Sequence, residues 1–244
     1  LPGAQREAIP PFLGLFQFST WSAEQAVPSN LIEAIRIQQP LFEQARFEDC
    51  PYLGLSAFSR RDAPLFFGRR QETLQALTYL GNQQQINPEQ LPKTSGVSYT
   101  RWLQIEGNSG SGKSSMVNAG MLPLIEQGVL WARTGFSQWH ILGPMMPGKD
   151  PIEKLAEILE RGLKPNPADR DITTRVNQLN AQPAKALTRT LKQFRQSDTA
   201  FLLIVDQFEE LLTFAEPQAR KQFDALLADA LQDSDCPLFL INTV

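Results

Sequence analysis

The sequence predicts an α/β fold in which a parallel β-sheet lies between two layers of helices. Short apolar runs typical of strands alternate along the chain with longer runs that have helical periodicity. The clearest strand-like run, FLLIV at residues 201–205, is apolar at every position, which is typical of a strand buried on both faces. A glycine-serine loop at residues 107–112 joins another such strand to a helix. Together these observations favour a three-layer architecture.

The first half of this fold can be predicted in order along the chain. FFGRRQETLQALTYL, residues 66–80, places Leu74, Leu77 and Leu80 on one face of a helix. LPKTSG reads as a loop, and RWLQIEG is the strand before the glycine-serine loop. A helix over about residues 114–124 and a strand at SQWHIL complete this half.

The second half has stronger end signals. DPIEKLAEILERG predicts a helix with Asp150 as N-cap, Pro151 at the first position, Glu153 completing a capping box and Gly162 ending it. AKALTRTLKQF and EPQARKQFDALLADALQ predict two further helices, which flank the strand FLLIV. PLFLINTV predicts a last strand.

The domain organisation follows from where these patterns begin. Residues 1–48 carry no chemical motif and are predicted to be a linker or the tail of a preceding domain, with a short helix opened by Asn30. Residues 49–244 form the α/β domain. Because the chain starts at Leu1 and ends inside a strand at Val244, we expect it to be part of a longer protein.

Composition excludes several classes of protein. The 244 residues are 42% hydrophobic and 20% charged, with a net charge of −3, which gives no general attraction to nucleic acid or anionic membranes. No apolar run approaches the ~20 residues that a membrane-spanning helix needs. Cys50 and Cys236 lack metal-ligand spacing, so we interpret them as reduced packing residues in a cytoplasmic protein.

The remaining unusual side chains are predicted to pack. His140, the single histidine, lies inside the presumed strand SQWHIL, and no nucleophilic cysteine stands near it in sequence. Trp102, Trp131 and Trp139 are expected to pack against the sheet.

The glycine-serine loop is a candidate phosphate-binding site. GNSGSGKS at residues 107–114 fits the pattern G-x-x-x-x-G-K-S/T after a strand and before a helix. Its glycines allow backbone N–H groups to surround a phosphate, Lys113 supplies a cation for the β- and γ-phosphates, and the Ser114 hydroxyl is a ligand for Mg²⁺. Ser115 adds a second hydroxyl at the start of the helix. The predicted binding residues of the loop are Gly107, Asn108, Ser109, Gly110, Ser111, Gly112, Lys113, Ser114 and Ser115.

A second candidate element follows the strand FLLIV. Asp206 stands at its carboxyl end, where ligands bind in open α/β sheets, and a triphosphate site needs such a carboxylate to hold Mg²⁺. Glu209 and Glu210 follow within one turn, so either could orient or deprotonate a water molecule. Acidic residues that only stabilise a helix N-terminus are the structural alternative.

These motifs resemble a known family. CPYLGLSAFSRRDAPLFFGRRQETLQAL, GNSGSGKSSMVNAGMLPLI, MPGKDPIEKLAEIL and VDQFEELL are similar, in this order, to motifs of bacterial STAND-type NTPases. Those are signal-transduction ATPases related to NACHT and apoptotic-scaffold proteins. The resemblance covers about four-fifths of the chain and implies a P-loop NTPase fold of the ASCE, AAA+-like class.

The resemblance also implies roles for individual residues. Phe67, Gly68 and Arg69 belong to an hhGRxxE element, completed by Phe66 and Glu72, that resembles the adenine-contacting segment of relatives. The acidic residues resemble the NACHT form of the Walker B motif, which supports Glu210 as the residue that positions water. The chain departs from the family at Met146, where relatives usually have an arginine.

The function implied by the resemblance is a molecular switch. Bound ADP would hold an inactive state, and exchange for ATP would drive homo-oligomerisation and activate an N-terminal effector in response to a C-terminal sensor domain. Slow ATP hydrolysis would reset the switch, in bacterial defence or signalling. The alternative is an AAA+-like ATPase that acts on nucleic acid, favoured only by the pairs Arg60-Arg61 and Arg69-Arg70.

Overall fold

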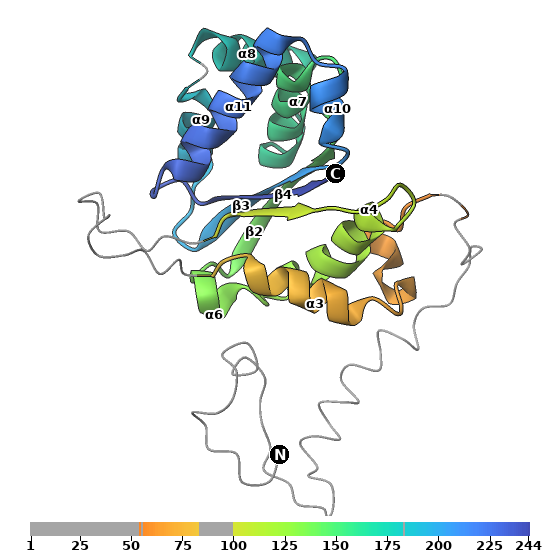
Figure 1. Cartoon of the computed structure of the whole chain (residues 1–244). Coiled ribbons are helices and arrows are strands. Elements are labelled where there is room, and N and C mark those ends of the chain that lie inside the picture. The colour runs from red at the N-terminus through yellow and green to blue at the C-terminus, as the bar shows by residue number, and fades with distance from the viewer. Residues whose placement is uncertain (1–53, 55, 83–99, 183) are drawn as a thin grey trace, which may run out of the picture.

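A parallel β-sheet forms the centre of the fold (Figure 1). The computed structural model describes residue 54 and residues 56–82, 100–182 and 184–244. Within this part of the chain the strands pair in the order β1-β4-β3-β2, and each neighbouring pair is parallel. Their bounds are β1 Trp102–Ile105, β2 Gln138–Met145, β3 Thr199–Val205 and β4 Leu238–Thr243. The predicted α/β class with a parallel sheet is confirmed.

Some predictions lie outside the described residues. They are the linker over residues 1–48, with the helix opened by Asn30, the loop LPKTSG at residues 91–96, and the packing of Cys50.

β4 lies between the strand that precedes the phosphate loop and the strand that precedes Asp206. Its register places Leu240 beside both Trp102 of β1 and Leu203 of β3. Because the strands are parallel, their carboxyl ends share one edge of the sheet. The phosphate loop after β1, Asp206 after β3 and Thr243 at the end of β4 therefore meet at this edge.

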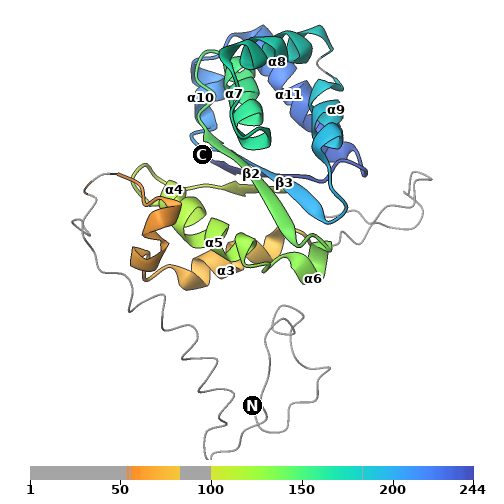
Figure 2. The same cartoon turned by 180° about the vertical axis from the view of Figure 1, so that it is seen from behind.

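Helices cover both faces of the sheet, as Figures 1 and 2 show. They are η3 Arg60–Leu65, α3 Arg70–Tyr79, α4 Lys113–Ser115, the π-helical η5 Met116–Met121, α5 Leu122–Glu126, α6 Trp131–Thr134, α7 Pro151–Leu163, α8 Asp169–Ala181, α9 Ala186–Phe194, α10 Glu209–Thr213 and α11 Pro217–Gln232. One face carries α7, α8, α9 and α11, and the other carries α3, α6 and the phosphate-loop helix, which runs through α4, η5 and α5. Within the described ranges, no helix is long and apolar enough to cross a membrane.

The position of β3 between two layers of helices explains why its sequence is apolar throughout. Every residue of this strand is buried. Leu203 packs in the core cluster on the α7 side, whereas Leu202 and Ile204 pack in the cluster on the α3 side. Since successive side chains of a strand point to opposite faces, a sheet covered twice needs apolar residues at every position.

The helix predicted over residues 150–162 forms α7, but Gly162 lies inside it and does not end it. Asp150 is the N-cap and Pro151 the first residue, as predicted. The predicted capping box with Glu153 is wrong, because no side-chain hydrogen bond caps the helix and Glu153 is only an acidic residue of its first turn. The predicted end at Gly162 is wrong, because α7 continues to Leu163. A Cβ at Gly162 would lie 2.5 Å from Cδ2 of Leu142. The glycine therefore allows α7 to approach β2 closely.

The other predicted helices are confirmed with shifts at their ends, and η3, α6, α8 and α10 are additions. The helix over residues 66–80 begins later, at Arg70, and the phosphate-loop helix extends to Glu126. α8 was not predicted, because its apolar residues are sparse and its buried side chains are Arg175 and Leu179. A polar helix of this kind gives little periodic signal.

The predictions for the aromatic residues are partly correct. Trp139 packs against the core on the α3 side, and the His140 ring stacks on Phe201 with centroids 5.5 Å apart. Trp102 and Trp131 are largely exposed, with exposed fractions of 53% and 58%, although Nε1 of Trp102 donates to Oδ1 of Asn242 on β4 at 2.6 Å. Trp102 belongs to β1, an edge strand of the described sheet, and Trp131 to the short helix α6 at the surface.

Candidate functional site

The phosphate loop follows β1, and glycine is required at several of its positions for different structural reasons. Gly110 and Gly112 adopt positive φ angles of 75° and 84°, where a side chain would be strained. A Cβ at Gly107 would lie 2.9 Å from Oγ of Ser111, because the loop folds closely onto itself. The Ser111 N–H closes this turn by donating to the Asn108 carbonyl at 3.0 Å.

The loop directs unused hydrogen-bond donors outward. Among the described residues, the backbone N–H groups of Gly110, Gly112, Lys113 and Ser114 donate to no backbone or side-chain acceptor. The last three stand at the start of the phosphate-loop helix, where the first N–H groups have no intrahelical partner and the helix dipole is positive. Such a group of donors suits an anion with several oxygens, such as a polyphosphate.

The Lys113 side chain folds back onto the phosphate loop and contacts its backbone. Its Nζ donates to the Gly107 carbonyl at 2.6 Å and to the Asn108 carbonyl at 3.1 Å. An ammonium has three donors, so one remains for a further acceptor in the loop. The position fits the predicted contact of Lys113 with phosphate.

Ser114 and Asp206, the predicted Mg²⁺ ligands, lie side by side. The Ser114 hydroxyl donates to Oδ1 of Asp206 at 2.9 Å, although the two residues are far apart in sequence. In the described part of the chain, no three His, Cys, Asp or Glu side chains gather to hold a metal ion. A hydroxyl and one carboxylate nevertheless match Mg²⁺ bound with water and phosphate oxygens, so the pair fits this ion.

Thr243 is a site residue that the sequence analysis missed. Its hydroxyl donates to Oδ1 of Asp206 at 2.5 Å and accepts a hydrogen bond from the Gln207 N–H at 3.1 Å. The side chain is almost completely buried at the end of β4. The available signal was a threonine two residues after the apolar run LFLI, but only the strand order places it beside Asp206.

The two glutamates after Asp206 have different surroundings. A carboxylate oxygen of Glu210 accepts a hydrogen bond from the Gly148 N–H at 3.2 Å. This contact joins α10 to the loop between β2 and α7. Glu210 is half-buried, whereas Glu209 is exposed. Glu210 is thus held in place at the carboxyl edge of the sheet, and its role toward water remains a prediction.

The segment before α3 is fastened to the phosphate-loop helix. The Ser115 hydroxyl accepts a hydrogen bond from the Phe58 N–H at 3.0 Å, so this hydroxyl serves the fold. A Cβ at Gly120 would lie 2.8 Å from Oγ1 of Thr73, which shows how closely α3 packs on this helix. Two separate contacts, one on each side of the hhGRxxE element, therefore hold this segment against the phosphate-loop helix.

Within that element, Arg69 reaches the loop itself. Its Nη1 would lie 3.6 Å from a Cβ at Gly112. Gly68 has a positive φ of 86° and directs the chain into α3. Phe66 packs toward the core, whereas Phe67 has 68% of its surface exposed. Of the two aromatic rings, the exposed one is better placed to meet a planar ligand.

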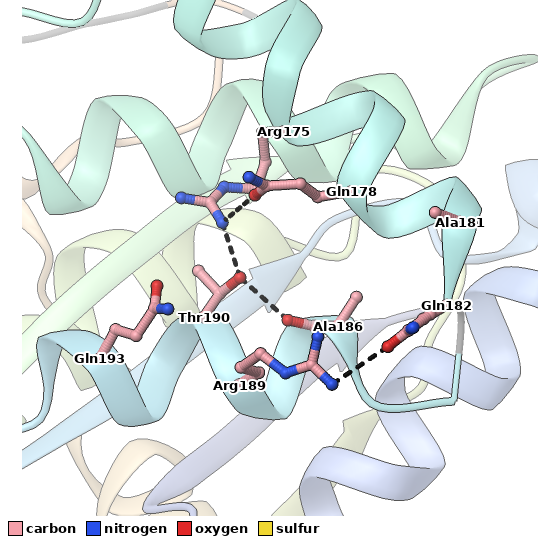
Figure 3. Close-up of a pocket in the computed structure, with 8 residues that line it drawn as sticks. All are labelled: Arg175, Gln178, Ala181, Gln182, Ala186, Arg189, Thr190 and Gln193. Carbon is pink, nitrogen blue, oxygen red and sulfur yellow. Dashed lines mark hydrogen bonds between the residues drawn. The ribbon is translucent and has the colours of Figure 1, made fainter.

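A cavity of about 330 Å³ lies elsewhere, between α8 and α9 (Figure 3). Arg175 donates there to Oε1 of Gln178 at 2.7 Å and to Oγ1 of Thr190 at 2.8 Å. Arg189 donates to Oε1 of Gln182 at 3.0 Å. Because α8 and α9 cover the face opposite the phosphate-loop helix, this cavity is separate from the candidate site.

The comparisons with known proteins agree with the motifs. A family model described as Novel STAND NTPase 1 matches residues 51–244, which include the phosphate loop, Asp206 and the strands of the described sheet. A search of curated proteins and a search of solved structures found no match. The resemblance to STAND NTPases is confirmed, and with it a nucleotide-binding switch in general terms. Since the match covers most of the chain, this protein belongs to the Novel STAND NTPase 1 family.

Proposed function

We propose that residues 49–244 form an ATP- and ADP-binding switch with the P-loop fold of the ASCE, AAA+-like class. The observation that carries the proposal is the 2.9 Å hydrogen bond between Ser114 Oγ and Asp206 Oδ1 beside the unused donors of the phosphate loop. The order β1-β4-β3-β2 supports it, because it places one strand between the phosphate loop and the acidic strand end.

The chain's own residues define how a nucleotide would be held. The loop N–H groups from Gly110 to Ser114 would bind the phosphates, with Lys113 at the β- and γ-phosphates. Ser114 and Asp206 would hold Mg²⁺, which neutralises phosphate charge when bound. Phe67, Gly68 and Arg69 would contact the adenine side, because their segment is fastened to the phosphate-loop helix.

The switch would use these contacts to distinguish two states. A ligand shifts an equilibrium only by binding the two conformations differently, and the γ-phosphate makes contacts that ADP cannot make. ATP would favour a homo-oligomer that brings N-terminal effector domains together, and ADP would favour the inactive form. Slow hydrolysis, with Glu210 positioning the water, would reset the protein in bacterial defence or signalling within the cytoplasm.

The structure adds no support for the nucleic-acid alternative. Arg60 pairs with Glu126, and Arg69 lies against Gly112 of the phosphate loop. One arginine of each pair that favoured a nucleic-acid partner therefore already has a contact within the domain.

The first test identifies the nucleotide that the purified protein carries. The protein is denatured, and any released nucleotide is identified by chromatography, beside the variant Lys113→Ala. Lys221→Ala is the matched control, because this exposed lysine lies on α11, on the opposite face of the sheet. We expect ADP from the wild type and from Lys221→Ala, and none from Lys113→Ala. A wild-type protein that neither carries, binds nor hydrolyses adenine nucleotides would overturn the proposal.

A further inference from the structure

Gln207 has an unusual backbone conformation directly beside the candidate Mg²⁺ ligand. Its φ of 53° is the only positive φ of a non-glycine residue in the described part of the chain. L-residues enter this left-handed region at a cost in free energy, and asparagine or aspartate tolerate it better than longer side chains do. Backbone strain of this kind persists only where the surrounding structure enforces it, and it concentrates at functional sites.

The neighbouring strands enforce this conformation through the backbone. The Gln207 N–H donates to Oγ1 of Thr243 at 3.1 Å, and the Phe208 N–H donates to the Thr243 carbonyl at 2.8 Å. On the other side of the turn, the Glu210 N–H donates to the Gln207 carbonyl at 2.9 Å. The backbone N–H groups of the two residues after Asp206 are thus both bound to Thr243 of β4, and the chain turns sharply into α10.

The backbone geometry alone does not require glutamine. Glycine would adopt this φ without strain, so the turn could be made at lower cost. In an extended strand, the residue after Asp206 would place its side chain on the opposite face of the sheet from the aspartate. The left-handed φ ends that alternation, and the Gln207 side chain is exposed at the carboxyl edge of the sheet.

We propose that Gln207 is a specificity-determining residue that hydrogen-bonds the terminal phosphate of a bound nucleoside triphosphate. The inference rests on the proposed nucleotide-binding function and adds a residue that distinguishes triphosphate from diphosphate. An amide suits this role, because its NH₂ group donates to a phosphate oxygen while its carbonyl oxygen can still accept from water. It adds no negative charge beside Asp206, Glu209 and Glu210, unlike a further carboxylate.

The test compares two substitutions at this position in the otherwise unchanged chain. Gln207→Gly removes both the side chain and the strain, whereas Gln207→Asn keeps a shorter amide that tolerates the left-handed region. Dissociation constants for ADP and for a non-hydrolysable ATP analogue are measured by calorimetry with Mg²⁺, and thermal unfolding is followed without nucleotide. Neither readout depends on hydrolysis, so a slow or inactive ATPase does not affect the result.

We expect Gln207→Gly to unfold roughly 2–4 °C higher than the wild type, because strain is relieved. It should bind ADP within about twofold of the wild type and the ATP analogue about tenfold more weakly, a difference of about 1.4 kcal/mol. Gln207→Asn should lose less of the preference for the analogue. Unchanged affinity for both nucleotides, or equal losses for both, would overturn the inference and leave the proposed function standing. A wild type that binds neither nucleotide would overturn both.

Discussion

At the scale of single residues, the contacts of the two glutamates after β3 distinguish them, whereas their spacing in the sequence does not. Glu209 and Glu210 stand next to each other at the start of α10, and either could reach the same edge of the sheet. The Glu210 carboxylate, however, is oriented by the Gly148 N–H, whereas Glu209 is exposed. A group that positions water must itself be held in place, so the structure favours Glu210 over Glu209 for this proposed role.

This difference predicts unequal effects of two otherwise identical substitutions. Glu210→Gln keeps the acceptor for the Gly148 N–H but removes the charge and the basicity, so steady-state ATP hydrolysis should fall by about 100-fold. Glu209→Gln should stay within about twofold of the wild type. Both variants should keep the wild-type affinity for ADP. A larger loss in Glu209→Gln than in Glu210→Gln would show that the two roles are reversed.

At the scale of elements, a buried ion pair joins α7 to the polar helix α8. Nε of Arg175 lies 2.7 Å from Oε1 of Glu160, and only 2% of the glutamate side chain and 10% of the arginine side chain are exposed. Arg175 also donates to Thr190 of α9. The few apolar residues of α8 are therefore supplemented by a charged contact that holds three helices together.

Removing one partner of this pair should destabilise the domain strongly. Glu160→Gln leaves the buried Arg175 guanidinium without its counter-charge, and the free energy of unfolding should fall by about 3 kcal/mol. Glu157→Gln on the same helix is the matched control, because Glu157 pairs with Lys154 and Arg161, whose side chains are 55% and 64% exposed. That change should cost less than about 1 kcal/mol. Urea unfolding measures both, and similar losses would contradict this account.

At the scale of the whole molecule, the sheet divides the core into two clusters, and Cys236 lies in the one on the α7 side. Its thiol is completely buried, two residues before the start of β4. Burial, with a smaller contribution from the Asp233 carboxylate, raises the pKa of Cys236 from 9.0 to about 11. The folded protein therefore favours the neutral thiol.

This pKa shift predicts that the fold loses stability in alkali. The raised folded-state pKa means that the folded protein holds the proton more tightly than the unfolded chain between pH 9 and about 11, so stability falls across that window. The shift of about two units corresponds to at most about 2.7 kcal/mol. Urea unfolding at pH 8 and pH 10.5 would compare Cys50→Ser with the double variant Cys50→Ser, Cys236→Ala. The double variant should show the smaller loss, and equal losses would contradict the prediction.

The features that the sequence determined by itself are those formed by contiguous residues. The strand FLLIV, the end of the strand at Asp206 and the loop from Gly107 to Ser114 are specified by local composition and spacing. The same residues that make a phosphate loop chemically useful also impose its turns, so the motif could be recognised before any fold was known. Family membership follows from the order of such local motifs.

The tertiary structure alone decided how distant segments meet. It placed β4 between β1 and β3, and so joined Thr243 to Asp206 and imposed the left-handed turn at Gln207. It also showed that Gly162 allows close packing of α7 on β2 and does not end the helix. The ion pair of Arg175 with Glu160 likewise holds α8 against α7. The physical reason is common to these cases. Periodicity reports which face of an element is apolar, whereas a hydrogen bond or a close approach between segments depends on strand order and packing, which no local pattern encodes.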